Sequence, residues 1–280
     1  LNVNYFHVVF TIPNELNVLC LIDPKFMYKV LFDISAETIK ELSKDKTYLG
    51  AKIGFTSVLH TWGQNLSLHP HIHMIVPGGG IDSNGKWKNS KEKFFLPVKV
   101  VSKLFKGKFL SYTKKNFDQR KIKDEEQFQN IINTCYSKDW VVYTKKPMKS
   151  AKHVVKYLGR YTHRIAISNA RIKKYEDNKV TFSYKDYSDH NKIKEMTLED
   201  TEFFRRYMMH VLPSNFMKIR HYGFLGNRNK EERIKAVRTA TNTKNPGPLL
   251  IDYEQIISDI LKRDVSICIK CGQKRHHQLE

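Results

Sequence analysis

The chain has 280 residues, of which 49 are lysine or arginine and 28 are acidic, so its net charge is +21 at pH 7. With 40% hydrophobic residues it can bury a core, which excludes a disordered chain. No run of about 18 uninterrupted apolar residues occurs, which excludes a bilayer-spanning helix. The positive charge extends along the whole chain and favours a polyanionic partner, with nucleic acid ahead of an anionic membrane surface.

The four cysteines are too few for a disulfide scaffold and fit a reducing cytoplasm. Cys20 and Cys135 stand among apolar residues, as buried thiols do. The sequence has no recognisable signal peptide. Because the chain begins at Leu1, we expect a further segment upstream of it in the natural protein.

The first part of the chain predicts a strand, a helical region and a hairpin. Residues 5–13 are rich in β-branched and aromatic side chains and predict a strand. Apolar residues then recur at helical spacing over residues 14–46. Residues 54–64 and 70–76 are strand-like runs separated by the short polar segment NLSL, which predicts a hairpin between them.

The rest of the chain predicts more helices and several short strands. Helices are expected over residues 98–118, 124–135, 148–164 and 200–213, and strands over 140–145, 164–168, 179–186 and 192–198. Two basic helical stretches follow from about residue 229. Together these elements predict an α+β fold, in which helices pack on an antiparallel sheet that carries the hairpin. We expect this domain over residues 1–200, followed by a smaller, basic and mainly helical C-terminal region over 201–280.

Four histidines, His60, His69, His71 and His73, lie within fourteen residues of the predicted hairpin. Alternate residues of a strand share a face, so His71 and His73 point the same way and can bind one metal ion. Scattered surface histidines are the alternative, but this clustering favours a metal site. Two or three imidazoles leave coordination positions open for a substrate, as a catalytic site requires, and they leave the identity of the metal open.

The partner strand adds further candidate ligands. If NLSL forms the turn, then His60 lies opposite His73 and Gln64 lies opposite His69. His60 and Gln64 then share the face of His71 and His73, whereas a one-residue slip would move them to the other face. His69 precedes a proline at the mouth of the strand and is expected outside the ligand set.

Tyr157 and Tyr161 stand four residues apart in a predicted helix and therefore share one face of it. Such a pair commonly packs on a core, but here basic side chains surround it, namely Lys156, Arg160, His163 and Arg164. Cations lower the pKa of a phenol from its usual value near 10 and can hold a phosphate. Next to a metal that polarises a phosphodiester, a tyrosine can attack phosphorus and become joined to a DNA end.

These features resemble a known family. His71-Ile72-His73 matches the HUH motif of single-strand endonucleases, in which U is a hydrophobic residue. The segments VLHTWGQNLSLHPHIHMIVPGG, YLGRYTHRIAISNARI, MKIRHYGFLGNR and YFHVVFTIPNEL are similar to the two-tyrosine transposases of rolling-circle insertion sequences of the IS91 type. The resemblance covers residues 5 to 230, roughly, and it makes residues 1–200 an HUH-type catalytic domain with its histidines on a central strand.

The resemblance implies the cofactor and the chemistry. The ion would be Mg²⁺ or Mn²⁺, held by His71, His73 and a third ligand, either His60 or Gln64. Tyr157 and Tyr161 would be the nucleophiles, one of which forms a 5′-phosphotyrosine and frees a 3′-OH. The partners would be single-stranded DNA at the transposon ends and at the target, in the cytoplasm of a prokaryote and associated with its nucleoid.

The family also carries a cysteine-rich zinc domain before its first strand, and this chain begins too late to contain it. Near the other end, Cys268 and Cys271 form one half of a zinc-ribbon spacing, which His276 and His277 could complete. The alternative is a remnant that binds no Zn²⁺.

The remaining basic residues suit a groove for single-stranded DNA, in which cations follow phosphates and rings stack on bases. The candidate DNA contacts are Arg160, Arg164, Arg171, Arg220 and Arg228, with the aromatic residues Tyr175, Tyr184 and Tyr222 between them. The alternative is a solvated basic face.

Three other functions compete with a transposase. A replication initiator or a relaxase would use the same chemistry. A decayed element could remain as a non-catalytic, basic DNA-binding protein. A hydrolytic metal nuclease would use activated water and would need no tyrosine.

Overall fold

The computed structural model describes residues 1–91, 95–122, 124–148, 166–245, 247, 258, 264–267 and 271–273. Within these residues the chain forms six α-helices and a five-stranded antiparallel sheet, so the predicted α+β class is confirmed. None of the helices in this part of the chain is long and apolar enough to cross a bilayer. The contacts divide the chain into two compact units, residues 1–243 and 244–280. The predicted functional division at residue 200 stays a prediction.

Several predicted residues lie outside the described part. They are Tyr157, Tyr161, Arg160 and Arg164 of the expected helix over 148–164, and Cys268, His276 and His277 of the expected zinc site.

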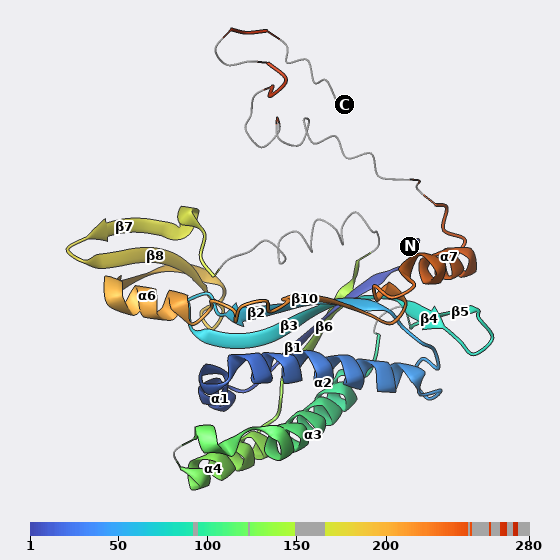
Figure 1. Cartoon of the computed structure of the whole chain (residues 1–280), viewed down its shortest axis with the longest axis horizontal. Helices are drawn as coiled ribbons and strands as arrows, with labels where there is room; N and C mark the ends of the chain where they lie inside the picture. The colour runs from blue at the N-terminus through green and yellow to red at the C-terminus, as the bar shows by residue number, and fades with distance from the viewer. Residues whose placement is uncertain are drawn as a thin grey trace. The chain divides into compact units, whose positions relative to one another are not determined.

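The central sheet has the strand order β10-β2-β3-β1-β6, and every neighbouring pair is antiparallel (Figure 1). Its strands are β1 (Tyr5–Thr11), β2 (Phe55–Trp62), β3 (Leu68–Pro77), β6 (Val142–Met148) and β10 (Ile219–Tyr222). β3 is the middle strand. It has a strand on each flank. Its side chains point alternately to the two faces of the sheet, one of which is covered by helices.

Helices cover one face of this sheet. They are α1 (Asn17–Ile22), α2 (Pro24–Lys44), α3 (Val98–Asn116) and α4 (Glu125–Ser137), joined by the short helices η1 (Asn14–Leu16) and η2 (Gln119–Lys121). Figure 1 shows α2 next to the sheet and α3 with α4 beyond it. α2 begins at Pro24 because the Asp23 carboxylate accepts a hydrogen bond from the Phe26 amide at 3.0 Å. Phe10, Ile72 and Phe105 are fully buried in this layer.

A second, three-stranded sheet lies between β6 and β10 of the central sheet in sequence. It consists of β7 (Ile172–Glu176), β8 (Lys179–Asp186) and β9 (Lys192–Glu199), and it is covered by α6 (Asp200–Met208). Phe182 and Phe203 pack edge to face in its small core, at 5.8 Å between ring centroids. Leu66, from the connection between β2 and β3, is also fully buried in this core. The hairpin that carries the histidines is thus packed against the second sheet.

The remaining elements are β4 (Gly79–Ile81), β5 (Trp87–Asn89), η3 (Asn169–Arg171), η4 (Gly223–Leu225) and α7 (Lys230–Ala240). Two expectations need correction. The strand predicted at 164–168 is absent over its described residues 166–168, because the chain there leads into η3 and the strand begins only at Ile172. The helix predicted over 200–213 ends at Met208.

Candidate metal centre

The hairpin of β2 and β3 brings the histidines together, although its register differs from the predicted one. His60 lies opposite His71, and Val58 lies opposite His73, so the register is shifted by two residues from the prediction. The turn is formed by residues 63–67, where the Gly63 amide donates to the Ser67 carbonyl at 2.9 Å, and the pairing is irregular between His60 and Trp62. A shift of two residues preserves the face of every side chain. His60 therefore still joins His71 and His73.

The spacing of the three imidazoles fits a single ion. Candidate ligand nitrogens of His60, His71 and His73 all lie within 4.8 Å of one another. The Nε2 atoms of His71 and His73 are 3.1 Å apart. Two nitrogens bound to one ion at about 2.1 Å lie about 3.0 to 3.4 Å apart in octahedral or tetrahedral geometry. The pair is therefore placed for binding side by side on one metal.

Hydrogen bonds fix which nitrogen of His71 faces the site. The His71 Nδ1 atom is 2.6 Å from the carbonyl oxygen of His69, and a carbonyl can only accept. Nδ1 therefore carries the proton, and Nε2 keeps a lone pair that points toward His73. Metal-binding histidines are usually held in the same way, with the ring nitrogen that does not bind the metal donating a hydrogen bond to a protein acceptor.

His7 on β1 performs the same task for His73. Its Nε2 atom is 2.8 Å from His73 Nδ1, and the two rings stack at 5.0 Å between centroids. When a metal takes Nε2 of His73, Nδ1 must hold the proton and donate it to His7. His7 was not among the predicted site residues. The sequence signal for it is a histidine inside an otherwise apolar strand. In the structure the His7 side chain is only 4% exposed, so it needs a hydrogen-bond partner.

Burial keeps the ligands neutral. Loss of hydration lowers the pKa of His71 to about 3, with smaller contributions from the neighbouring imidazoles. The same causes hold the pKa of His73 far below its usual range. Both rings are therefore uncharged at neutral pH, which is the form that binds metal ions.

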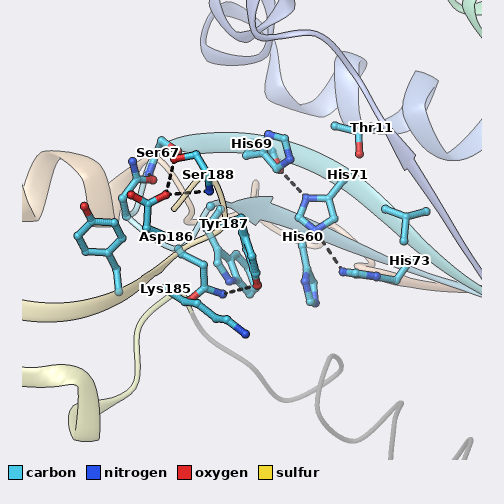
Figure 2. A pocket seen from close by; sticks show the side chains of 16 residues that line it. Thr11, His60, Ser67, His69, His71, His73, Lys185, Asp186, Tyr187 and Ser188 are labelled. Atoms are coloured by element: carbon cyan, nitrogen blue, oxygen red, sulfur yellow. Dashed lines mark hydrogen bonds between the residues drawn. The ribbon is translucent and has the colours of Figure 1, made fainter. Parts of the chain in front are cut away.

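The histidines open into a cavity of about 510 Å³. Its other wall is the end of β8 and the turn after it, residues 184–188 (Figure 2). Gln64 also lines the cavity, but its Nε2 atom donates to the Tyr187 hydroxyl at 3.4 Å. Of the two candidates for a third ligand, His60 has its candidate ligand nitrogen within 4.8 Å of those of His71 and His73.

The turn between the histidine strands is held by three side chains from elsewhere in the chain. Its successive carbonyl oxygens at residues 64, 65 and 66 accept hydrogen bonds from Arg171, Arg206 and His210, respectively. Arg171 also donates through Nε to the Ser183 carbonyl at 2.8 Å. The guanidinium predicted to contact DNA thus joins the hairpin to β8.

Two other predicted DNA contacts lie elsewhere in the unit. Arg220 on β10 stacks over Phe32, with its Cζ 4.2 Å from the ring centroid, and lies 3.5 Å from a carboxylate oxygen of Asp33. Arg228 is exposed in the segment before α7. Their role in DNA binding stays a prediction.

We expect the His7→Phe variant to bind Mn²⁺ about 10- to 100-fold more weakly than the unmodified chain, because His73 Nδ1 loses its hydrogen-bond partner. Calorimetric titration of Mn²⁺ measures this affinity. His7→Gln keeps a side-chain acceptor and should recover part of the loss. Equal affinity of the Phe variant and the unmodified chain would contradict a positioning role for His7.

Comparisons with known proteins identify the family of the chain. The sequence model of the family described as "Putative transposase" matches residues 54–233. The chain is 40% identical over 287 aligned residues to the "Putative transposase y4qJ" of Sinorhizobium fredii, covering 98% of this chain and 72% of that protein. It is 29% identical over 274 residues to the "Transposase for insertion sequence element IS801" of Pseudomonas savastanoi pv. phaseolicola, covering 96% and 66%. No solved structure matches the chain. The chain therefore belongs to the putative transposase family.

Proposed function

We propose that this protein is an insertion-sequence transposase of the two-tyrosine HUH type, which cleaves and rejoins single-stranded DNA during rolling-circle transposition. The observation that carries the proposal is the convergence of His60, His71 and His73 on one face of the central sheet, beside an open cavity. Membership of a transposase family, the similarity to a transposase of the element IS801 and the net charge of +21 support it.

In this proposal the three histidines hold Mn²⁺ or Mg²⁺. Three imidazole nitrogens suit Mn²⁺ better than Mg²⁺, which prefers oxygen ligands. When bound, the ion polarises a phosphodiester and stabilises the charge that develops on it. His60 is the third ligand in this account, because its candidate nitrogen lies within 4.8 Å of those of His71 and His73.

The phenol oxygen of Tyr157 or Tyr161 attacks the phosphorus and displaces the 3′ oxygen, which leaves as a hydroxyl after taking up a proton. The 5′ end of the DNA is then held as a phosphotyrosine. One P–O bond forms and one breaks, so a free 3′-OH can reverse the step and join strands. The second tyrosine lets cleavage at the donor and at the target alternate. The assignment of Tyr157 and Tyr161 as nucleophiles rests on their spacing in the sequence and on the family resemblance.

We expect the Tyr157→Phe/Tyr161→Phe double variant to form a covalent adduct with single-stranded DNA at less than about one thousandth of the rate of the unmodified chain. Labelled DNA from an end of the element is incubated with Mn²⁺ and run on a denaturing gel, where the adduct is retarded. Tyr143→Phe, on an exposed edge strand, is the control and should leave the adduct unchanged.

The same gel separates the alternatives. DNA cleavage without an adduct would indicate activated water, which a three-histidine site with open positions can support. DNA binding with neither product would indicate a non-catalytic remnant. A replication initiator or relaxase would also form the adduct, and the family match favours the transposase. Zinc at Cys268 and Cys271 stays a separate prediction.

A further inference from the structure

The wall of the cavity that faces the histidines carries an exposed aromatic ring. Tyr187, in the turn between β8 and β9, is 67% exposed and lines the same cavity as His60, His71 and His73. Lys185 lies against this ring, with its Nζ 5.7 Å from the ring centroid. Figure 2 shows Lys185, Asp186, Tyr187 and Ser188 lying to one side of the histidine strands. An aromatic ring and an ammonium group thus stand beside the candidate metal centre.

The turn is ordered by its own hydrogen bonds. The carboxylate of Asp186 accepts from the amide of Ser188 at 2.9 Å and from its hydroxyl at 2.6 Å. His190 and Asn191 adopt left-handed backbone angles, with φ of 49° and 64°, and complete the reversal. The pairing of β8 with β9 continues to Asp186, opposite Lys192. The ring is therefore exposed on a preorganised support, which reduces the ordering cost of binding a ligand there.

The acidic groups of the turn are neutralised within it. Lys194 Nζ lies 2.8 Å from a carboxylate oxygen of Asp186 and 3.0 Å from one of Asp189. This pairing holds the pKa of both carboxyls below the usual range, so they stay ionised and paired. The repulsion that two carboxylates would exert on an incoming phosphate is thereby reduced, which leaves Lys185 to attract it.

The Gln64 side chain, in the turn between β2 and β3, donates a hydrogen bond to the Tyr187 hydroxyl. The ring is therefore in contact with the turn that joins the two histidine-bearing strands. A ligand stacked on the ring would therefore lie next to whatever group the histidines bind. The cavity of about 510 Å³ is of the size of a small-molecule site and can take one nucleotide. Bases stack on aromatic rings whatever their identity, provided that they are unpaired.

We propose that Tyr187 stacks on one unpaired base next to the scissile phosphate, while Lys185 contacts a neighbouring phosphate of the same strand. The β8–β9 turn would then be the element that makes this site prefer single-stranded over double-stranded DNA. The inference rests on the proposed function in that it takes DNA as the ligand. The inference adds Tyr187 as a residue that binds the DNA only where a base is unpaired.

The test measures binding in the presence of a chelator, so that covalent chemistry does not contribute. Fluorescein-labelled oligo(dT) of about 20 nucleotides, longer than the usual site of one single-strand binding module, is titrated and followed by anisotropy. Tyr187→Ala should weaken binding about 10-fold, within the range measured for one base–aromatic stack, and Tyr187→Trp should retain it. The matched control is Tyr136→Ala, 43% exposed on α4 and outside the residues that line the cavity, and it should change the Kd less than twofold.

A series of oligonucleotides, each with one abasic position, locates the stack. At one position the abasic site should weaken binding to the unmodified chain about 10-fold and leave binding to Tyr187→Ala unchanged. Equal affinities of the Tyr187→Ala and Tyr136→Ala variants would overturn the inference. If the unmodified chain forms no adduct with Mn²⁺ but Tyr187→Ala still weakens DNA binding, the proposed function fails and the stacking inference is retained. If the adduct forms without a Tyr187 effect, only the stacking inference fails.

Discussion

The His73→Ala variant should bind Mn²⁺ more than about 100-fold more weakly than the unmodified chain and should form no detectable DNA adduct. His73 carries a candidate ligand nitrogen 3.1 Å from that of His71, and a contact with His7 holds its ring. Loss of an outer hydrogen-bond partner alone costs a metal site 10- to 100-fold, and loss of the ligand itself should cost more. Calorimetric titration with Mn²⁺ measures the change.

His69→Ala is the control for this prediction. The His69 side chain lines the same cavity, and it is the backbone carbonyl of His69 that accepts the hydrogen bond from His71 Nδ1. We therefore expect its Mn²⁺ affinity to stay within about threefold of the original, because the backbone acceptor is retained. Equal losses in both variants would show that the ion binds elsewhere or that the strand has rearranged.

Ile72→Ala should lower the free energy of unfolding by about 2 to 5 kcal/mol, the usual cost of such a cavity. Ile72 stands between the two histidines but faces the other way, into the helical layer, where it is fully buried. Its role is to fix the strand that presents the ligands. Urea unfolding followed by circular dichroism measures the difference.

Ile72→Val separates this effect from metal binding. Removing one methylene group should cost about 0.5 to 1.5 kcal/mol and should leave the Mn²⁺ affinity of the folded protein unchanged. A large loss of metal affinity in the Val variant, without loss of stability, would contradict the separation of the two faces of β3.

The sequence was a good guide to the histidine face and a poor guide to its register. The two-residue alternation of a strand places His71 and His73 together whatever the partner strand does. The partner of His71 depended on the turn, and the turn of residues 63–67 is set by contacts far away in sequence. Leu66 is buried in the second core with φ of 62°, and the adjoining carbonyls are held by Arg171, Arg206 and His210. No local pattern encodes those contacts.

The same limit explains the elements and roles that were missed. All five residues of β7 are exposed, so it has no alternation to detect, and β10 is a four-residue strand with a mixed sequence. The charge of Arg171 predicts a DNA contact, which stays a prediction, but no local pattern predicts its hydrogen bonds to the hairpin turn and to Ser183 on β8. By contrast, the burial of Cys20 and Cys135 followed from their apolar neighbours and is confirmed.

The most direct test of the account is a cleavage reaction on single-stranded DNA from an end of the element, labelled at either the 5′ or the 3′ end and supplied with Mn²⁺. A tyrosine that attacks phosphorus and releases a 3′-OH predicts that the 3′ label moves with the protein on a denaturing gel and that the 5′ label leaves as a shorter free strand. A 5′ label that stays with the protein, or two free fragments with no labelled protein, would contradict the proposed 5′-phosphotyrosine.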